Sequence, residues 1–289
     1  MDYGLFEARH LRFHCMIEMR RWNCSDNVEL ANTDTTFLQF HFDCVVTGMS
    51  PKPDAFQSLR ERFADVRKRI ETAARASGRP SEEITLVAIT KTHPAEVLQA
   101  ALELGVGDLG ENRVQEAEEK ITAVGRDVAR WHLVGHLQTN KARRAVSLFD
   151  VVHSLDSSAL AERLERLCAE EGRQSLDVLV QIDLAGEVTK SGIETAELPA
   201  LLSTLKECSH LRLIGLMTLP PFFENPDCSR PFFKTVRELR DELRGQGHFG
   251  SASGELSMGM SHDFEVAIDE GATMVRVGTA LFGERQPRE

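Results

Sequence analysis

A lysine stands at the end of an apolar segment near the start of the regular part of the sequence. Residues 84–91 read ITLVAITK, a run of apolar and β-branched residues typical of a buried strand. An unpaired ammonium is costly inside a protein, so Lys91 either reaches solvent from the strand end or has a chemical role. A neutral lysine amine can form a Schiff base with a carbonyl compound, and apolar neighbours favour that neutral form. Lys91 is therefore a candidate for Schiff-base chemistry.

Two segments near the C-terminal end combine small and hydroxyl residues in a way that suits a phosphate. Ser261 precedes the helical pattern HDFEVAIDEG, where its hydroxyl and the free N–H groups of a first helical turn can hold an anion. Gly278 and Thr279, in MVRVGTALFG, offer close backbone approach and a second hydroxyl. The alternatives are a simple N-cap at Ser261 and a glycine bend at Gly278. Taken together, the two segments predict a phosphate pocket.

An arginine lies two residues before that glycine. Side chains two apart on a strand share a face, so Arg276 points into the same space as Gly278. A guanidinium keeps its proton and donates hydrogen bonds to an acceptor. An interior salt bridge is the other interpretation of Arg276.

The elements that must position these residues alternate along the chain. After a helical stripe at 54–77, short apolar runs alternate with amphipathic helices. Eight such strands predict a parallel α/β fold, either an open doubly wound sheet or a single (β/α)8 TIM-type barrel with an extra N-terminal helix. The number of strands favours the barrel, because eight parallel strands close it. The expected strands are 84–91, 108–111, 131–135, 151–155, 177–184, 212–218, 254–260 and 274–278. The expected helices between them are 94–104, 113–124, 140–148, 157–171, 194–208, 229–244 and 262–270.

Composition excludes several classes of function. The chain has 289 residues and a net charge of -11, with no basic block, so nucleic acid is not an expected partner. No apolar stretch is long enough to span a membrane. Six cysteines without a C-x-x-C pair indicate reduced thiols and a cytoplasmic location. His132 and His136 lack neighbouring cysteines or carboxylates, so no metal site is expected.

The first 48 residues differ from the rest. They hold three of the six cysteines and show no clean helical or strand period. We expect residues 1–48 to be a poorly ordered N-terminal extension and residues 49–289 to form the barrel.

Eight segments in order resemble one family, the pyridoxal-phosphate homeostasis proteins, which are related to the alanine racemase N-terminal barrel. The segments are LVAITKTHPAE, GENRVQEAEEK, WHLVGHLQTNKAR, VVHSLDS, TKSGI, GLMTLPP, LSMGMSHDFEVAI and VRVGTALFGER. The resemblance, which covers about residues 54 to 285, implies a pyridoxal 5'-phosphate-binding barrel. It implies that Lys91 forms the Schiff base, that Ser261, Gly278 and Thr279 hold the phosphate, that Arg276 faces the pyridine nitrogen and that Asn112 lines the pocket. His93 stands where many relatives have a second lysine.

The resemblance leaves open whether the cofactor is used or only held. An arginine at the ring nitrogen weakens the electron sink, and a racemase needs a second acid or base, which in alanine racemase is a tyrosine. This chain has one tyrosine, Tyr3, in the extension. We therefore expect a monomeric carrier that takes part in vitamin B6 homeostasis. Its expected partners are pyridoxal-dependent apoenzymes, which would receive the cofactor from it. The alternatives are a weak amino-acid racemase or other pyridoxal-phosphate enzyme with Lys91 as sole base, and a class I aldolase.

Overall fold

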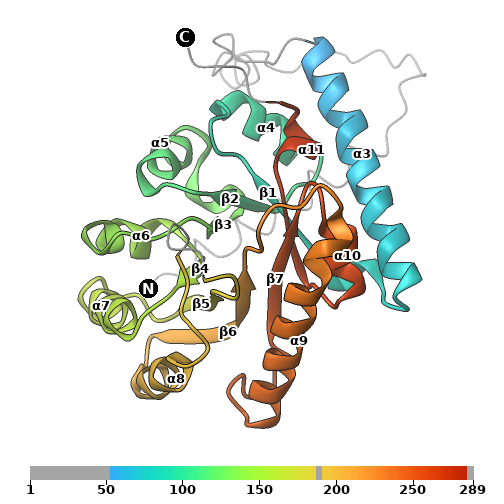
Figure 1. Cartoon of the computed structure of the whole chain (residues 1–289). Helices are drawn as coiled ribbons and strands as arrows, with labels where there is room; N and C mark the ends of the chain where they lie inside the picture. Colours follow the sequence, from blue (N-terminus) through green and yellow to red (C-terminus); the bar gives the residue numbers. More distant parts are fainter. Residues whose placement is uncertain (1–52, 187–190, 285–289) are drawn as a thin grey trace, which may run out of the picture. The chain divides into compact units, whose positions relative to one another are not determined.

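Eight parallel strands form a closed barrel in this protein (Figure 1). The computed structural model describes residues 53–186 and 191–284, so the predicted extension at 1–48 lies outside the described residues. The strands follow one another around the barrel in chain order, and β8 pairs with β1. This closure confirms the barrel and rules out the open sheet. The strands are β1 (Thr85–Ile89), β2 (Asp108–Glu111), β3 (Arg130–Leu133), β4 (Val151–Leu155), β5 (Leu176–Ile182), β6 (Leu211–Thr218), β7 (Glu255–Met260) and β8 (Met274–Val277).

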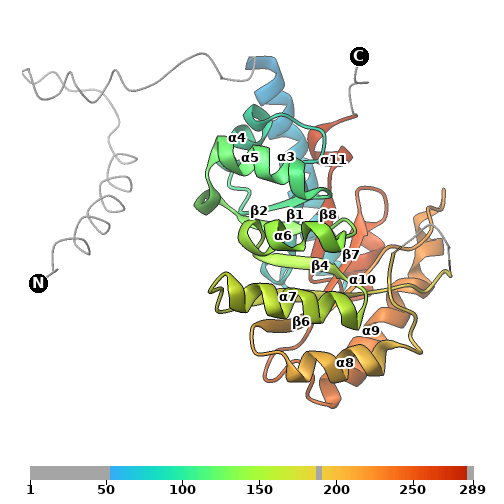
Figure 2. The ribbon, with the colours of Figure 1, turned by 90° about the vertical axis from the view of Figure 1, so that its left-hand side faces the viewer.

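Helices follow the strands around the outside, and Figure 2 shows α4 to α8 arranged in sequence along the wall. None of the helices in the described ranges is long and apolar enough to cross a membrane. The helices are α3 (Pro53–Ala76), α4 (Ala95–Glu103), α5 (Val114–Val124), α6 (Ala142–Leu148), α7 (Ser158–Glu170), α8 (Leu198–Glu207), α9 (Arg230–Gly245), α10 (Phe264–Asp269) and α11 (Thr279–Phe282). Short 3-10 turns are η2 (Ser81–Glu83), η3 (Arg126–Val128), η4 (Thr139–Lys141) and η5 (Pro226–Ser229).

Side chains of β1 alternate between the barrel interior and the layer shared with the helices. Val87 and Ile89 pack inside the barrel, in a small apolar cluster of their own. Leu86 and Ala88 belong to the larger core between strands and helices. This period of two is the expected strand pattern, and it directs the end of β1 towards the mouth of the barrel.

The extra helix α3 packs beside α10 and α11, the helices that follow β7 and β8 (Figure 1). The Arg62 Nε donates to the carbonyl of Leu281 in α11 at 2.9 Å. The Arg69 Nε donates to Glu265 Oε1 in α10 at 2.6 Å. The predicted extra helix therefore contacts the two short helices that follow the predicted phosphate residues Ser261 and Gly278.

A buried charged cluster holds the loop after β1. The Lys120 Nζ donates to the carbonyl of Thr90 at 2.6 Å, to Glu111 Oε1 at 2.6 Å and to Glu116 Oε1 at 2.8 Å. The Thr90 hydroxyl donates to the same Glu111 oxygen at 2.5 Å. Thr90, Glu111 and Lys120 are all buried. The cluster thus ties α5 to the end of β1.

The same cluster explains a difference from the sequence prediction, which placed Lys91 on the first strand. That placement is wrong, because β1 ends at Ile89 and Lys91 lies in the following turn. The carbonyl of Thr90 bonds Lys120, and Thr92, with a left-handed φ of 68°, donates its N–H to Glu116. Both peptide neighbours of Lys91 are therefore held by side chains of α5.

Burial raises the pKa of Glu111 above its ordinary value of 4.5, although the charge of Lys120 opposes the shift. A carboxyl whose pKa rises on folding stabilises the fold most at low pH and loses that contribution as pH rises through its folded value. We therefore expect the free energy of unfolding of the wild type, relative to Glu111→Gln, to fall as pH rises from the ordinary value of 4.5 through the raised folded-state pKa. Urea unfolding of both proteins measures this difference, and a difference that grows with pH would contradict the expectation.

The close contact of β6 with β7 yields a second prediction. A Cβ on Gly215 would lie 2.0 Å from the Glu255 carbonyl oxygen, on the neighbouring strand. We expect Gly215→Ala to lower the free energy of unfolding by about 1–3 kcal/mol or more, because the strands must separate. Gly107→Ala is the control, since nothing lies within 4 Å of its Cβ. Its effect should stay within about 0.5 kcal/mol. Equal effects of the two substitutions would refute the steric argument.

Candidate functional site

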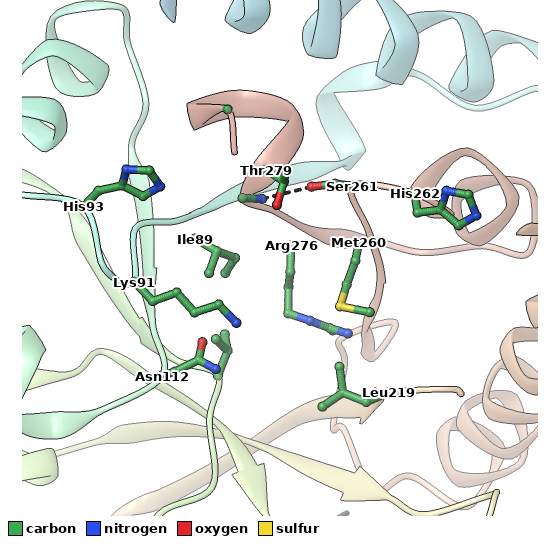
Figure 3. A pocket seen from close by; sticks show the side chains of 13 residues that line it. Ile89, Lys91, His93, Asn112, Leu219, Met260, Ser261, His262, Arg276 and Thr279 are labelled. Atoms are coloured by element: carbon green, nitrogen blue, oxygen red, sulfur yellow. Dashed lines mark hydrogen bonds between the residues drawn. The ribbon is translucent and has the colours of Figure 1, made fainter. Parts of the chain in front are cut away.

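One cavity at the carboxyl ends of the strands contains every residue that the sequence singled out for a site (Figure 3). Its volume is about 340 Å³, within the range of small-molecule sites. Catalytic and binding residues of such barrels lie at this end, because the loops after the strands converge there. The predicted residues that line the cavity are Lys91, Asn112, Ser261, Arg276, Gly278 and Thr279.

Lys91 enters the cavity from the loop after β1. Figure 3 shows its side chain pointing into the pocket, towards Arg276. Asn112, which directly follows β2, lines the cavity as well. The loop after β3 passes close behind Asn112, since a Cβ on Gly135 would lie 2.3 Å from the Asn112 carbonyl oxygen. The absence of a side chain at Gly135 therefore permits this arrangement of the two loops.

Ser261 and the start of α11 meet through hydrogen bonds. The Ser261 Oγ accepts the N–H groups of Gly278 and Ala280, each at 3.2 Å. The sequence left a simple N-cap at Ser261 as the alternative to an anion site, but α10 begins at Phe264 and Asp263 occupies the N-cap position. The hydroxyl instead bridges the ends of β7 and β8, which brings the two predicted phosphate segments together.

Gly278 allows the end of β8 to approach the end of β1. A Cβ at this position would lie 3.3 Å from the Ile89 carbonyl oxygen and 3.5 Å from the Ile89 Cβ. The first of these distances is tighter than most real contacts, so a larger residue would push the two strand ends apart. Gly278 thus contacts the Ser261 hydroxyl and also lies close to Ile89, just before the loop that carries Lys91.

Arg276 is buried at the base of the cavity. Its Nη2 donates to the carbonyl of Thr218 at 2.9 Å, and its Nη1 donates to Ser257 Oγ at 2.7 Å. Both acceptors are neutral, so neither bond is the interior salt bridge that the sequence left open. Burial lowers the pKa of Arg276 to about 10, which leaves the guanidinium charged at neutral pH. The cavity therefore contains a fixed positive charge.

Sequence reasoning missed several residues of the cavity wall. Leu219 and Met260 supply apolar surface, and His262 lines the edge opposite His93 in Figure 3. Met260 and His262 flank Ser261 in the sequence, so their position was a usable signal. No sequence signal marked Leu219, because an apolar residue after a strand cannot be distinguished from an ordinary core residue.

The two histidines in WHLVGH lie in different surroundings. His132 is fully buried, whereas His136 is exposed and its Nδ1 lies 3.2 Å from Asp156 Oδ2. Within residues 53–186 and 191–284, no group of three or more His, Cys, Asp or Glu side chains has the arrangement of a metal site.

Comparison with known proteins shows which family this chain resembles. The family model described as alanine racemase, N-terminal domain, matches residues 62–286. A pyridoxal phosphate homeostasis protein of Aquifex aeolicus is 43% identical over 226 residues, which cover 78% of this chain and 98% of the relative. The protein of the same name from Escherichia coli strain K12 is 40% identical over 230 residues, 78% of this chain and 97% of the relative.

A solved structure agrees with these relatives. The structure of PipY from Synechococcus elongatus with PLP bound has a TM-score of 0.67 and 39% sequence identity. The similarity covers 78% of this chain and 100% of PipY. Two independent measures, sequence identity over nearly the whole relative and agreement of the fold, lead to the same assignment. The chain therefore belongs to the family of the pyridoxal phosphate homeostasis proteins, whose barrel is that of the alanine racemase N-terminal domain.

Proposed function

We propose that this protein binds pyridoxal 5'-phosphate as a Schiff base on Lys91 and takes part in intracellular vitamin B6 homeostasis. One observation carries the proposal: a single cavity is lined by a lysine amine, by the hydroxyl residues Ser261 and Thr279 beside Gly278, and by a buried arginine. Each of these suits a different part of the same small molecule. The similarity to PipY, whose structure has PLP bound, supports the choice of ligand.

The residues present fit the three polar parts of this cofactor. Ser261, Gly278 and Thr279 would hold the phosphate, since hydroxyl and backbone N–H groups suit its oxygens. Arg276 would donate a hydrogen bond to the ring nitrogen. Lys91 would supply the amine, whose nitrogen replaces the aldehyde oxygen, released as water. Asn112 would flank the bound molecule. When bound, the cofactor supplies an aldehyde for reversible capture and a ring that can accept electrons.

A carrier fits the cavity better than a racemase does. A charged arginine at the ring nitrogen disfavours protonation of the ring, which weakens electron withdrawal. The single tyrosine of the chain, Tyr3, lies outside the described residues. The alternative is a weak amino-acid racemase or another pyridoxal-phosphate enzyme, and the presence of His93 and His262 in the cavity wall makes a direct assay worthwhile.

The proposal extends to partners and location. A protein that holds the cofactor reversibly can pass it to pyridoxal-dependent apoenzymes, which we propose as its protein partners. We further propose that it acts as a monomer in the cytoplasm. The absence of a C-x-x-C pair among its six cysteines supports a reducing compartment. Analytical ultracentrifugation of the purified chain measures the oligomeric state.

We expect protein mixed with pyridoxal phosphate to show the visible absorption band of a Schiff base, and borohydride to fix the cofactor on Lys91. Lys91→Ala should abolish both the band and the covalent adduct, because Lys91 is the only lysine among the described residues that lines the cavity. Peptide mapping by mass spectrometry identifies the modified lysine. Lys234→Ala is the matched control, since Lys234 is an exposed lysine on α9 that lies 3.8 Å from Glu238. This control should behave as the wild type.

Three outcomes would contradict parts of the proposal. An adduct on another lysine would remove Lys91 from its role. No bound cofactor after reconstitution would refute the proposed ligand. Turnover of D- or L-amino acids that Lys91→Ala abolishes would favour the enzyme over the carrier.

A further inference from the structure

A line of hydrogen-bonded side chains crosses the barrel interior from the cavity to the opposite end. The Arg276 Nη1 lies 2.7 Å from Ser257 Oγ, which lies 2.9 Å from His153 Nδ1. The His153 Nε2 lies 2.8 Å from His132 Nδ1. The His132 Nε2 lies 2.8 Å from Asp108 Oδ1. Five strands contribute one residue each, so the line exists only in the closed barrel.

The two ends of this line determine the direction of every bond. A guanidinium only donates, so Ser257 accepts from Arg276 and can give its own proton to His153 Nδ1. His153 then donates from Nε2 to His132 Nδ1, and His132 donates from Nε2 to the Asp108 carboxylate, which only accepts. In this direction every proton has an acceptor, and both imidazoles would be neutral with the proton on Nε2.

The reverse direction of donation would leave the Asp108 carboxylate without a hydrogen-bond donor from His132. If His132 donated from Nδ1, its Nε2 would be an acceptor facing Asp108, unless the ring were charged. Burial lowers the pKa of His132 and of His153, which opposes that charge. The charged groups that face the two rings are Arg276, Arg130, Asp108 and Asp150. Only one arrangement of protons therefore satisfies the whole line.

We propose that Ser257, His153 and His132 are positioning residues that hold the Arg276 guanidinium in the cavity, through a one-directional line with both histidines protonated on Nε2. The identity of the ligand rests on the proposed function, whereas the histidine tautomers belong to the protein alone. Ser257 is the link that matters most, because it is the only one of the three that touches Arg276.

The arrangement orients the Arg276 guanidinium without neutralising its positive charge. A carboxylate in place of Ser257 would hold Arg276 firmly but would cancel its charge. Ser257 and Thr218 orient the guanidinium with neutral oxygens, so its charge remains available to a ligand. A hydroxyl that donates to an imidazole is also a better acceptor, since hydrogen bonds in a chain polarise one another. Asp108 stabilises the line from the far end of the barrel, where its side chain is 25% exposed.

Nuclear magnetic resonance of protein with ¹⁵N-labelled histidine tests the tautomers without any ligand. The expected result is a protonated Nε2 and an unprotonated Nδ1 in both rings. These protonation states should stay unchanged from about pH 6 to about pH 8, where a free imidazole would titrate. Single His132→Gln and His153→Asn variants assign the signals. A charged ring or an Nδ1–H tautomer at neutral pH in either histidine would overturn the proposal.

Ser257→Ala tests the effect on the cavity. We expect its dissociation constant for pyridoxal phosphate to rise about tenfold, because a charged donor loses its acceptor. The His153 Nδ1 signal should shift in the same variant, and Ser257→Thr should restore both properties. Thr273→Val is the control: it removes a hydroxyl that accepts from Leu256 N at 2.8 Å, near the opposite end of β7 and β8. This control should change neither readout.

The outcomes separate this inference from the proposed function. A folded Ser257→Ala protein that binds the cofactor as tightly as the wild type would overturn the positioning role. A wild type that binds no pyridoxal phosphate would refute the proposed function, while the tautomer spectrum would still decide the direction of the line. Thermal unfolding and circular dichroism establish that each variant is folded.

Discussion

The pairing of β1 with β8 is the constraint on which the rest of the site depends. Ala88 lies opposite Val277 in this pair, so both strands end at the same height. The turn with Lys91 and the segment Gly278–Thr279 therefore emerge side by side, although they lie at opposite ends of the regular sequence. In an open sheet the first and last strands would not meet, and the amine would have no anion site beside it.

Charged side chains that serve the cavity are buried in this structure, and burying a charge costs free energy. Lys120, Glu111 and Arg276 are all buried, and each has polar partners. Replacing such groups by apolar ones is often neutral or favourable for stability, so stability alone does not explain them. Their positions suggest another reason: Lys120 holds the backbone beside Lys91, and Arg276 charges the base of the cavity. The protein thus buries Arg276 inside the barrel, and Lys120 of α5 with Glu111, to arrange the mouth of the cavity.

Prediction from the sequence succeeded where local pattern and chemistry agreed. The apolar alternation of β1, the eight repeated strands and the hydroxyl and glycine residues at strand ends led to the right barrel and to residues of one cavity. It failed at the end of β1, where Lys91 lies in a turn, and it did not show that the Ser261 hydroxyl bonds the start of α11 rather than that of α10. Both points have one cause: a local pattern does not show bonds to residues distant in the chain, such as Thr90 to Lys120.

The sequence by itself determined the order and type of the elements, because periodicity and turn residues are local properties. It also determined which side chains could serve a cofactor, since amine, hydroxyl and guanidinium chemistry depends on residue type. Only the tertiary structure decided that these side chains share one cavity and that His132 and His153 connect Asp108 to Arg276. The physical reason is that all eight strands must curve into one closed barrel before side chains far apart in the chain come within hydrogen-bonding distance.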